Sequence, residues 1–396
     1  MTRRELLKLA ATLPLVLLVH SRPHDLLAVT TKPAKKERWD RVLILVELNG
    51  GNDGLNTLIP YGDGQYYQAR PRLAIPRERV LQLNEKLGLH YALEPLLPLW
   101  QAKELAWVQG VGYAKPNRSH FRSIEVWETA SDSEQILDEG WLARLFEIHP
   151  LPAEFTTEGI VLGRRDAGPL SGRTVRTIAL EEPQQFLQQA SRVRAVEQTR
   201  SNAALAHILQ VQRELTHAAG DLALRLQHAP SLQGTFPSSP IGKQLETAAQ
   251  LLVANVPVAV IKVSHGSFDT HAGQLGHHER LLKDLAEGLV AFRKTVQKAD
   301  LWERVLVMTY SEFGRRVGEN ASSGTDHGTA APHLVLGGKV KGGLYGATPS
   351  LMDLDEGDLK HQVDYRSLYS TVVKDWWGLP ATLFDWRDFP ALGFLA

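Results

Sequence analysis

The stretch RVLILVELNGGNDGLNTLIP, residues 41–60, joins an unbroken apolar run to a cluster of glycines around one aspartate. The run lacks the alternation of a half-exposed strand, which is typical of a strand covered on both faces of a parallel sheet. The cluster from Asn49 to Gly54 has two interpretations. It is a tight turn, or it is a loop whose glycines let the backbone approach an ion or ligand held by Asp53.

The same pattern recurs along the chain. Segments with helical spacing of apolar residues separate further apolar runs, and the longest such segment extends from about residue 183 to 255. The further apolar runs are residues 105–113, 159–163, 258–264, 304–310 and 333–338. Strands that alternate with helices predict an α/β fold, with a central, mainly parallel sheet and helices on both faces. We expect one such domain over residues 40–396.

Composition excludes several classes of function. The chain has 396 residues, of which 43% are hydrophobic, so it can bury a large core. Its formal net charge is zero and it has no long basic run, so we expect no nucleic-acid partner. It contains no cysteine, which excludes disulfides, thiolate metal sites and a cysteine nucleophile.

The first 21 residues, MTRRELLKLAATLPLVLLVHS, carry the pair Arg3 and Arg4 ahead of an apolar stretch. This pattern predicts a twin-arginine export signal, the translocase as a transient partner, and a periplasmic or extracellular location. Residues 22–39 are polar and basic and indicate a linker. An uncleaved signal would leave a membrane anchor, although the run is shorter than the ~20 residues of a comfortable span. The alternative is an ordinary amphipathic N-terminal helix.

Polar clusters stand at the ends of the predicted strands. Because the carboxyl ends of parallel strands meet at one edge of a sheet, we expect these clusters to converge. Carboxylates and imidazoles without thiolates predict one or two divalent ions, Zn²⁺, Mn²⁺, Mg²⁺ or Ca²⁺. For each cluster the alternative is plain turn chemistry. The clusters, in chain order, contain Asp53; Arg118, Ser119, His120 and Arg122; His265, Asp269 and His271; Glu312; and Asp326 and His327.

The motifs LVELNGGNDGLNTLIPY, NRSHFRS, SFDTHAGQ, YSEFGRR and GTDHGTAAPHLVLGGKVKGGLYG are specific in order and identity. Over residues 41–393 the chain resembles an uncharacterised, twin-arginine-exported bacterial family related to the alkaline phosphatase and sulfatase superfamily. The resemblance implies an alkaline phosphatase-like fold with one or two metal ions over the sheet. It also implies a co-encoded secreted protein as a partner.

The resemblance implies roles for individual residues. It assigns Ser119 as the nucleophile of an ester hydrolase. The guanidinium fork of Arg118 or Arg122 matches a tetrahedral anion, so we expect one of these arginines to clamp the ester oxygens. Where relatives place Asp-His, this chain has Glu312 and Phe313, and this departure removes one imidazole ligand. Either Asp326 replaces that ligand, or the site binds one ion rather than two. The metal ligands that the resemblance implies are Asp53, Asp269, His271, Glu312 and His327, with Asp326 as the replacement ligand.

The expected function is therefore that of an exported, metal-dependent hydrolase of phosphate or sulfate esters, acting on a small or polymer-borne anionic ester. Ser123 or a metal-bound hydroxide are alternative nucleophiles, and Ser119 fits equally well as a helix N-cap. The alternative function is a non-catalytic envelope or surface-polymer-associated protein that keeps the same fold.

Overall fold

The computed structural model describes residues 37–155, 157–180, 220–222, 224–232, 234–380, 382–385 and 387–396. The expected export signal, most of the expected linker, and residues 183–219 of the expected helical segment lie outside this part of the chain. Within the described part, no helix is both long enough and apolar enough to cross a membrane.

A nine-stranded sheet forms the centre of the molecule, with the order β11-β5-β10-β9-β1-β8-β6-β7 and with β14 paired to β5. Strand β1 pairs in parallel with both β8 and β9, whereas β10 is antiparallel to β9 and β5. The predicted α/β fold with a mainly parallel sheet is confirmed. The strands are β1 (Val42–Asn49), β5 (Leu105–Gly112), β6 (Gly159–Leu162), β7 (Thr177–Leu180), β8 (Val260–Gly266), β9 (Val305–Tyr310), β10 (Ala331–Gly337), β11 (Gly343–Tyr345) and β14 (Val363–Asp364).

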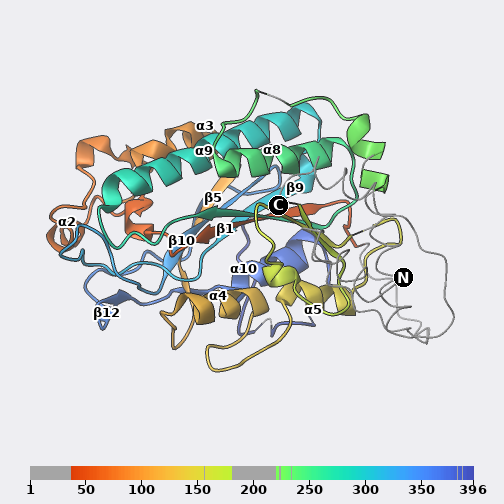
Figure 1. The fold of residues 1–396 in the computed structure, drawn as a ribbon. Coiled ribbons are helices and arrows are strands. Elements are labelled where there is room, and N and C mark those ends of the chain that lie inside the picture. Colours follow the sequence, from red (N-terminus) through yellow and green to blue (C-terminus); the bar gives the residue numbers. More distant parts are fainter. Residues whose placement is uncertain are drawn as a thin grey trace, which may run out of the picture.

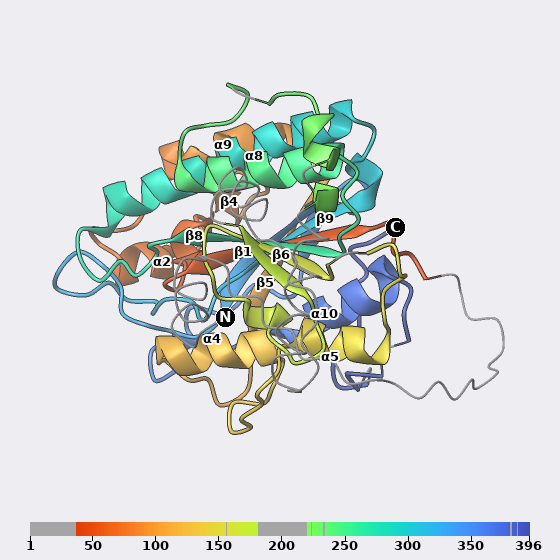
Figure 2. The ribbon, with the colours of Figure 1, turned by 45° about the vertical axis from the view of Figure 1, so that its right-hand side comes forward.

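Helices cover both faces of this sheet, as predicted (Figure 1). Helices α3 (Leu97–Gln101), α8 (Pro240–Val253) and α9 (Gln274–Lys298) form one outer layer, and α4 (His120–Thr129), α5 (Trp141–Ile148) and α10 (Arg366–Thr371) form the other. A view turned by 45° shows the same three layers (Figure 2).

Short elements complete the described chain. The small strands are β2 (Leu58–Ile59), β3 (Leu81–Gln82), β4 (Gly88–Leu89), β12 (Leu354–Asp355) and β13 (Asp358–Leu359). The short helices are α2 (Gly64–Ala69), η1 (Gly54–Asn56), η2 (Arg77–Arg79), η3 (Tyr91–Leu96), η4 (Gly168–Leu170), η5 (Trp302–Arg304) and η6 (Val372–Trp376).

The three layers explain why the first apolar run has no alternation. Ile44, Val46 and Leu48 pack in the core that includes α8 and α9. Leu43 and Leu45, on the other face of β1, pack in the core that includes α4, α5 and α10. Since both faces are covered, each position of the strand gains about 1.5–3 kcal/mol from burying a large aliphatic side chain.

The topology brings four loops to one edge of the sheet. The parallel strands β1, β8 and β9 end there, and so does β5, because β10 is antiparallel to both β5 and β9. For the same reason β10 begins at this edge. The segments that follow β1, β5 and β8, and the single segment that joins β9 to β10, therefore meet, and these are the segments that carry the polar clusters.

Candidate metal centre

The glycines in the loop after β1 allow this loop to contact its neighbouring loops closely. Gly50 and Gly51 have φ angles of +111° and +78°, in the region that favours glycine. The N–H of Gly50 donates to Glu312 Oε1 at 2.8 Å. A Cβ atom on Gly50 would lie 2.4 Å from the backbone nitrogen of Asp269. The glycines thus let the loop after β1 touch the loops after β8 and β9, and no bound ligand is needed to explain them.

Arg315, whose side chain is fully buried, ties these loops together. It donates to the carbonyls of Gly50 and Gly51 and to the Thr325 carbonyl. Its Nη2 also lies 2.7 Å from Asp269 Oδ1. Burial works to raise the pKa of Asp269, but the hydrogen bond and charge of Arg315, with help from the histidines, outweigh burial and lower that pKa to about 2. Asp269 is therefore an anion over the whole neutral range.

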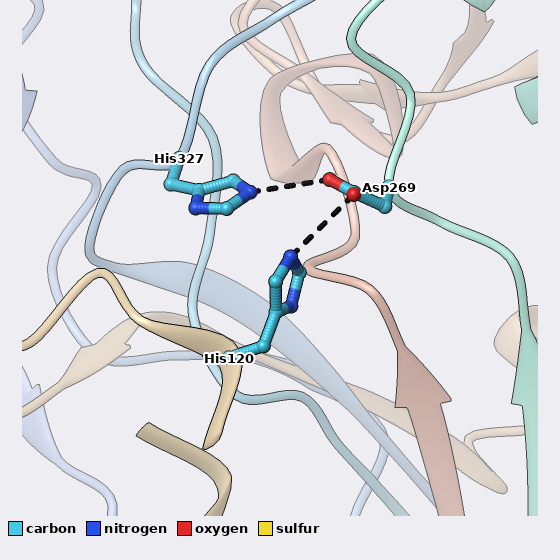
Figure 3. Close-up of side chains that lie close together, drawn as sticks. All are labelled: His120, Asp269 and His327. Atoms are coloured by element: carbon cyan, nitrogen blue, oxygen red, sulfur yellow. Dashed lines mark hydrogen bonds and ion pairs between the residues drawn. The ribbon is translucent and has the colours of Figure 1, made fainter. Parts of the chain in front are cut away.

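Three imidazoles surround the Asp269 carboxylate. Asp269 Oδ1 lies 3.0 Å from His271 Nε2 and 3.2 Å from His327 Nε2. Asp269 Oδ2 lies 3.5 Å from Nε2 of His120, the first residue of α4. The two Nε2 atoms of His271 and His327 are 3.0 Å apart. Figure 3 shows His120 and His327 both directed at Asp269. We call His120, Asp269, His271 and His327 the histidine cluster.

The other nitrogen of each imidazole faces a hydrogen-bond acceptor. Nδ1 of His327 lies 2.8 Å from the carbonyl oxygen of Arg118. Nδ1 of His120 lies 2.9 Å from Glu312 Oε1, and Nδ1 of His271 lies 3.3 Å from Asp326 Oδ1. With the proton on Nδ1, each imidazole donates to that acceptor and its Nε2 lone pair is available to a metal ion. Without an ion, a ring that is protonated on both nitrogens donates from Nε2 to Asp269 instead.

Three of the four groups of the cluster lie close enough together to share a metal ion, and His271 contacts two of them. His120, Asp269 and His327 offer ligand atoms that all lie within 4.8 Å of one another. In tetrahedral zinc sites with Zn–N bonds near 2.0–2.1 Å, neighbouring ligand atoms lie about 3.3 Å apart. The separations of 3.0–3.5 Å between the Nε2 atoms and the Asp269 oxygens are close to this value. Histidines whose second nitrogen is hydrogen bonded to a carboxylate or carbonyl are the usual arrangement around such ions.

Asp53, the residue at the centre of the glycine cluster, has other partners. It is fully buried, pairs with Arg70 Nη1 at 2.6 Å and accepts a hydrogen bond from Gln274. Its Oδ1 also accepts from the N–H of Leu55 at 3.2 Å. Burial works to raise the pKa of Asp53, and the charge of Arg70 outweighs it, so the pKa is lowered. Asp53 therefore neutralises a buried arginine and caps η1, and its carboxylate does not join the histidine cluster.

The remaining predicted residues divide into two groups. Asp269, His271 and His327 lie in the histidine cluster, and Glu312 and Asp326 contact its imidazoles from outside. The asparagine Asn320 donates to Asp326 at 3.1 Å, and this hydrogen bond is the main cause of the lowered pKa of Asp326.

Both predicted clamp arginines are bound elsewhere. Arg118 Nη2 lies 2.6 Å from Asp358 Oδ2, and Arg122 pairs with Glu125 at 2.8 Å. Arg122 also donates to the carbonyl of Ser133 at 3.0 Å and thereby holds the segment after α4. The clamp role of these arginines stays a prediction.

The two candidate serines differ. Ser119 is exposed and occupies the N-cap position of α4, yet its side chain makes no capping hydrogen bond. The backbone N–H of Ser119 is held instead by Asn117 Oδ1 at 2.8 Å. Ser123 is buried, donates its hydroxyl proton to the Glu312 carbonyl, and lies 2.7 Å from the Tyr113 hydroxyl. Of the two hydroxyls, only that of Ser119 is accessible to a substrate.

Sequence reasoning did not assign His120 as a ligand. The signal was present, because His120 follows Ser119 directly in the NRSHFRS motif. What was missing was the direction of the helix, since the first turn of α4 turns the His120 ring toward Asp269 and leaves Phe121 88% exposed.

The solved structures that are similar to this chain include the following three. The lipoteichoic acid synthase LtaP from Listeria monocytogenes is 10% identical with a TM-score of 0.35, and the match covers 75% of this chain and 65% of that chain. The C-terminal periplasmic domain of EptC from Escherichia coli is 9% identical with a TM-score of 0.39, covering 88% of this chain and 86% of that one. A protein in the alkaline phosphatase superfamily from Vibrio parahaemolyticus is 11% identical with a TM-score of 0.37, covering 80% and 64%.

The chain thus spans slightly less than two thirds of the length of LtaP and of the Vibrio protein. Because these identities and TM-scores are low, we infer the chemistry of the centre from this chain's own side chains and not from the matched proteins. A search of curated proteins gave no match. A family model does match: residues 40–378 fit the family described as "Protein of unknown function (DUF1501)", and the chain belongs to this family.

Proposed function

We propose that this protein binds one divalent metal ion in the histidine cluster and hydrolyses phosphate or sulfate esters there. One observation carries the proposal. Three imidazoles hold their Nδ1 atoms against acceptors and direct their Nε2 atoms toward the single carboxylate of Asp269. With Nδ1 protonated, the converging Nε2 lone pairs and the carboxylate repel each other unless a proton or a cation lies between them, and one bound ion supplies that positive charge to the whole cluster.

The donor chemistry narrows the choice of ion. Mg²⁺ and Ca²⁺ prefer sites made of oxygen, whereas imidazole suits Zn²⁺ and other transition metals. We therefore propose Zn²⁺ or Mn²⁺, held by Nε2 of His120, His271 and His327 and by Asp269. An ion bound there supplies Lewis-acid polarisation of the ester oxygens.

Ser119 is the proposed nucleophile. It stands between Arg118, whose carbonyl contacts His327, and His120, whose ring contacts Asp269. Attack of its Oγ on phosphorus or sulfur would form one ester bond and break the bond to the leaving oxygen, with the hydroxyl proton passing through water to that leaving oxygen. A second water would then cleave the new ester and return a proton to Ser119. The first N–H groups of the ten-residue helix α4 favour an anionic substrate at this point.

The first experiment measures metal content and turnover of the full-length protein. We expect one zinc per chain and turnover of p-nitrophenyl phosphate or p-nitrophenyl sulfate. The double variant Asp269→Ala, His271→Ala should lose at least about 100-fold in zinc affinity, because two of four ligands are gone. The exposed His228 is the matched control, and His228→Ala should keep both properties. Intact zinc binding in the double variant would refute the site.

A second candidate function is metal binding without ester hydrolysis, as in an envelope or surface-polymer protein. The ion pairs of Arg118 with Asp358 and of Arg122 with Glu125 favour it, because neither guanidinium is free to clamp an ester. Zinc binding without turnover of any ester tested, in both wild type and Ser119→Ala, would support this candidate. Turnover that disappears in Ser119→Ala would exclude it.

We also propose that residues 1–21 direct export through the twin-arginine translocase, which carries folded proteins. Support comes from Arg3 and Arg4 ahead of the apolar stretch. Export of folded protein would let the histidine cluster acquire its ion before the chain leaves the cytoplasm. Unchanged export after replacing both arginines by lysine would contradict this route.

A further inference from the structure

We propose that Glu312 is a positioning residue, which holds the His120 ring with Nε2 toward the metal ion and does not itself bind the ion. This inference rests on the proposed metal site. It assigns to Glu312 a different role from the direct ligand that the family resemblance implies.

The contacts of the carboxylate carry the inference. Glu312 Oε1 accepts the N–H of Gly50 at 2.8 Å and the Nδ1–H of His120 at 2.9 Å. Glu312 therefore contacts the Nδ1 side of the His120 ring, whereas Nε2, on the other side of the ring, faces Asp269. The other oxygen, Oε2, lies 3.4 Å from Ser311 Oγ. The Glu312 side chain is 2% exposed, so water does not compete for these contacts.

The backbone of Glu312 holds the same helix a second time. Its carbonyl accepts the hydroxyl proton of Ser123, which lies three residues after His120 on α4. Ser123 is in turn held by the Tyr113 hydroxyl at 2.7 Å. The first turn of α4 is thus bound to the loop after β9 through both a side chain and a backbone group. This double attachment sets the position of the His120 ring relative to Asp269.

The glycine loop takes part in the same arrangement. A Cβ atom on Gly50 would lie 2.9 Å from the Phe268 backbone nitrogen and 2.4 Å from that of Asp269. Only a glycine therefore brings its N–H to Glu312 while the loop after β8 stays in place. The glycine cluster after β1 therefore supplies, through the Gly50 N–H, one of the two donors that orient the Glu312 carboxylate.

The test is a double-mutant cycle on zinc affinity, with the absorption spectrum of the Co²⁺-substituted protein as the second measurement. Glu312→Gln keeps an oxygen that accepts both N–H groups, so its zinc affinity should stay within about tenfold of wild type and its Co²⁺ spectrum should be unchanged. Glu312→Ala should weaken zinc binding by about 10–100-fold, the usual effect of losing an outer partner of a ligand histidine. In the His120→Ala background, Glu312→Ala should have no further effect.

Each other outcome overturns the inference. If Glu312 is a ligand, Glu312→Gln will lose as much affinity as Glu312→Ala, and the loss will persist without His120. If Glu312 is only a packing residue, Glu312→Ala will lower thermal stability and leave zinc affinity and the Co²⁺ spectrum unchanged. In both cases the proposed metal site is still supported if the wild-type protein binds zinc and the His271→Ala variant does not. If the wild-type protein binds no zinc, both the site and this inference are overturned.

Discussion

Two groups of charged side chains in the described part of the chain differ in how their charges are satisfied. Inside the sheet, Lys262 Nζ lies 3.3 Å from Glu47 and 3.2 Å from Glu128, and the lysine is fully buried. At the edge of the sheet, three imidazoles and Asp269 face one another, and their side chains are 21–44% exposed. We call the first group the lysine network.

The difference separates structural charges from a candidate site. The lysine network contains its own cation, and a Cβ atom on Gly168 would lie 2.6 Å from Lys262 Nζ, so no ligand fits there. The histidine cluster has Arg315 as its buried cation, but Arg315 also serves four backbone carbonyls. The three Nε2 atoms that face Asp269 are partly exposed, so they can take an ion from solution in addition to Arg315.

The largest expected effect comes from removing the cation of the lysine network. Lys262→Met should lower the free energy of unfolding by about 3–5 kcal/mol, because it leaves the buried Glu128 without its cation and leaves Glu47 only the more distant Arg164. Urea unfolding measures this, and the exposed Lys294→Met is the control. The zinc affinity of the folded variant should be unchanged. A stability loss below about 1 kcal/mol would show that the network is not a structural ion cluster.

The next largest expected effect is a pH dependence of the free energy of unfolding, caused by Glu128 of the same network. Burial raises the pKa of Glu128 to about 7, above its ordinary value of 4.5. A raised carboxyl pKa means that the folded state holds a proton that the unfolded state has lost, so stability falls as pH rises from about 4.5 to 7. The difference in unfolding free energy between wild type and Glu128→Gln should therefore fall by on the order of 3 kcal/mol over that range.

Urea unfolding at pH 5 to 8, with chelator present to keep metal out of the histidine cluster, measures this difference. The control is Glu154→Gln, at an exposed glutamate, whose free energy of unfolding should depend on pH as that of wild type does. A Glu128→Gln curve that also runs parallel to wild type would mean that Glu128 is ionised in the folded protein.

The smallest effect compares two serines at helix N-caps. Ser239 accepts a hydrogen bond from the Gly242 N–H at 3.3 Å, whereas Ser119 makes no such bond. Ser239→Ala should cost about 1 kcal/mol of stability, the usual value of a cap. Ser119→Ala should change stability by less than about 0.5 kcal/mol and should abolish ester turnover. Thermal unfolding and a turnover assay are the two measurements. An equal stability loss in both variants would make Ser119 a structural cap.

The sequence by itself determined the fold class. Unbroken apolar runs separated by helical segments require strands covered on both faces, and the sheet between two helical layers satisfies that requirement. The sequence also predicted which loops meet, since the carboxyl ends of parallel strands share an edge. It predicted Asp269, His271 and His327 as candidates because Asp-x-His and Asp-His stand at such loops.

Only the tertiary structure decided which polar groups satisfy each other. Asp53 and Asp269 are both loop aspartates after a buried strand, and nothing local distinguishes them. The distinction comes from distant residues: Arg70 neutralises Asp53, whereas Arg315 holds Asp269 among three imidazoles. His120 joins that cluster because the loop after β9 fixes the first turn of α4. Such pairings depend on side-chain directions across the fold, and spacing along the chain does not encode them.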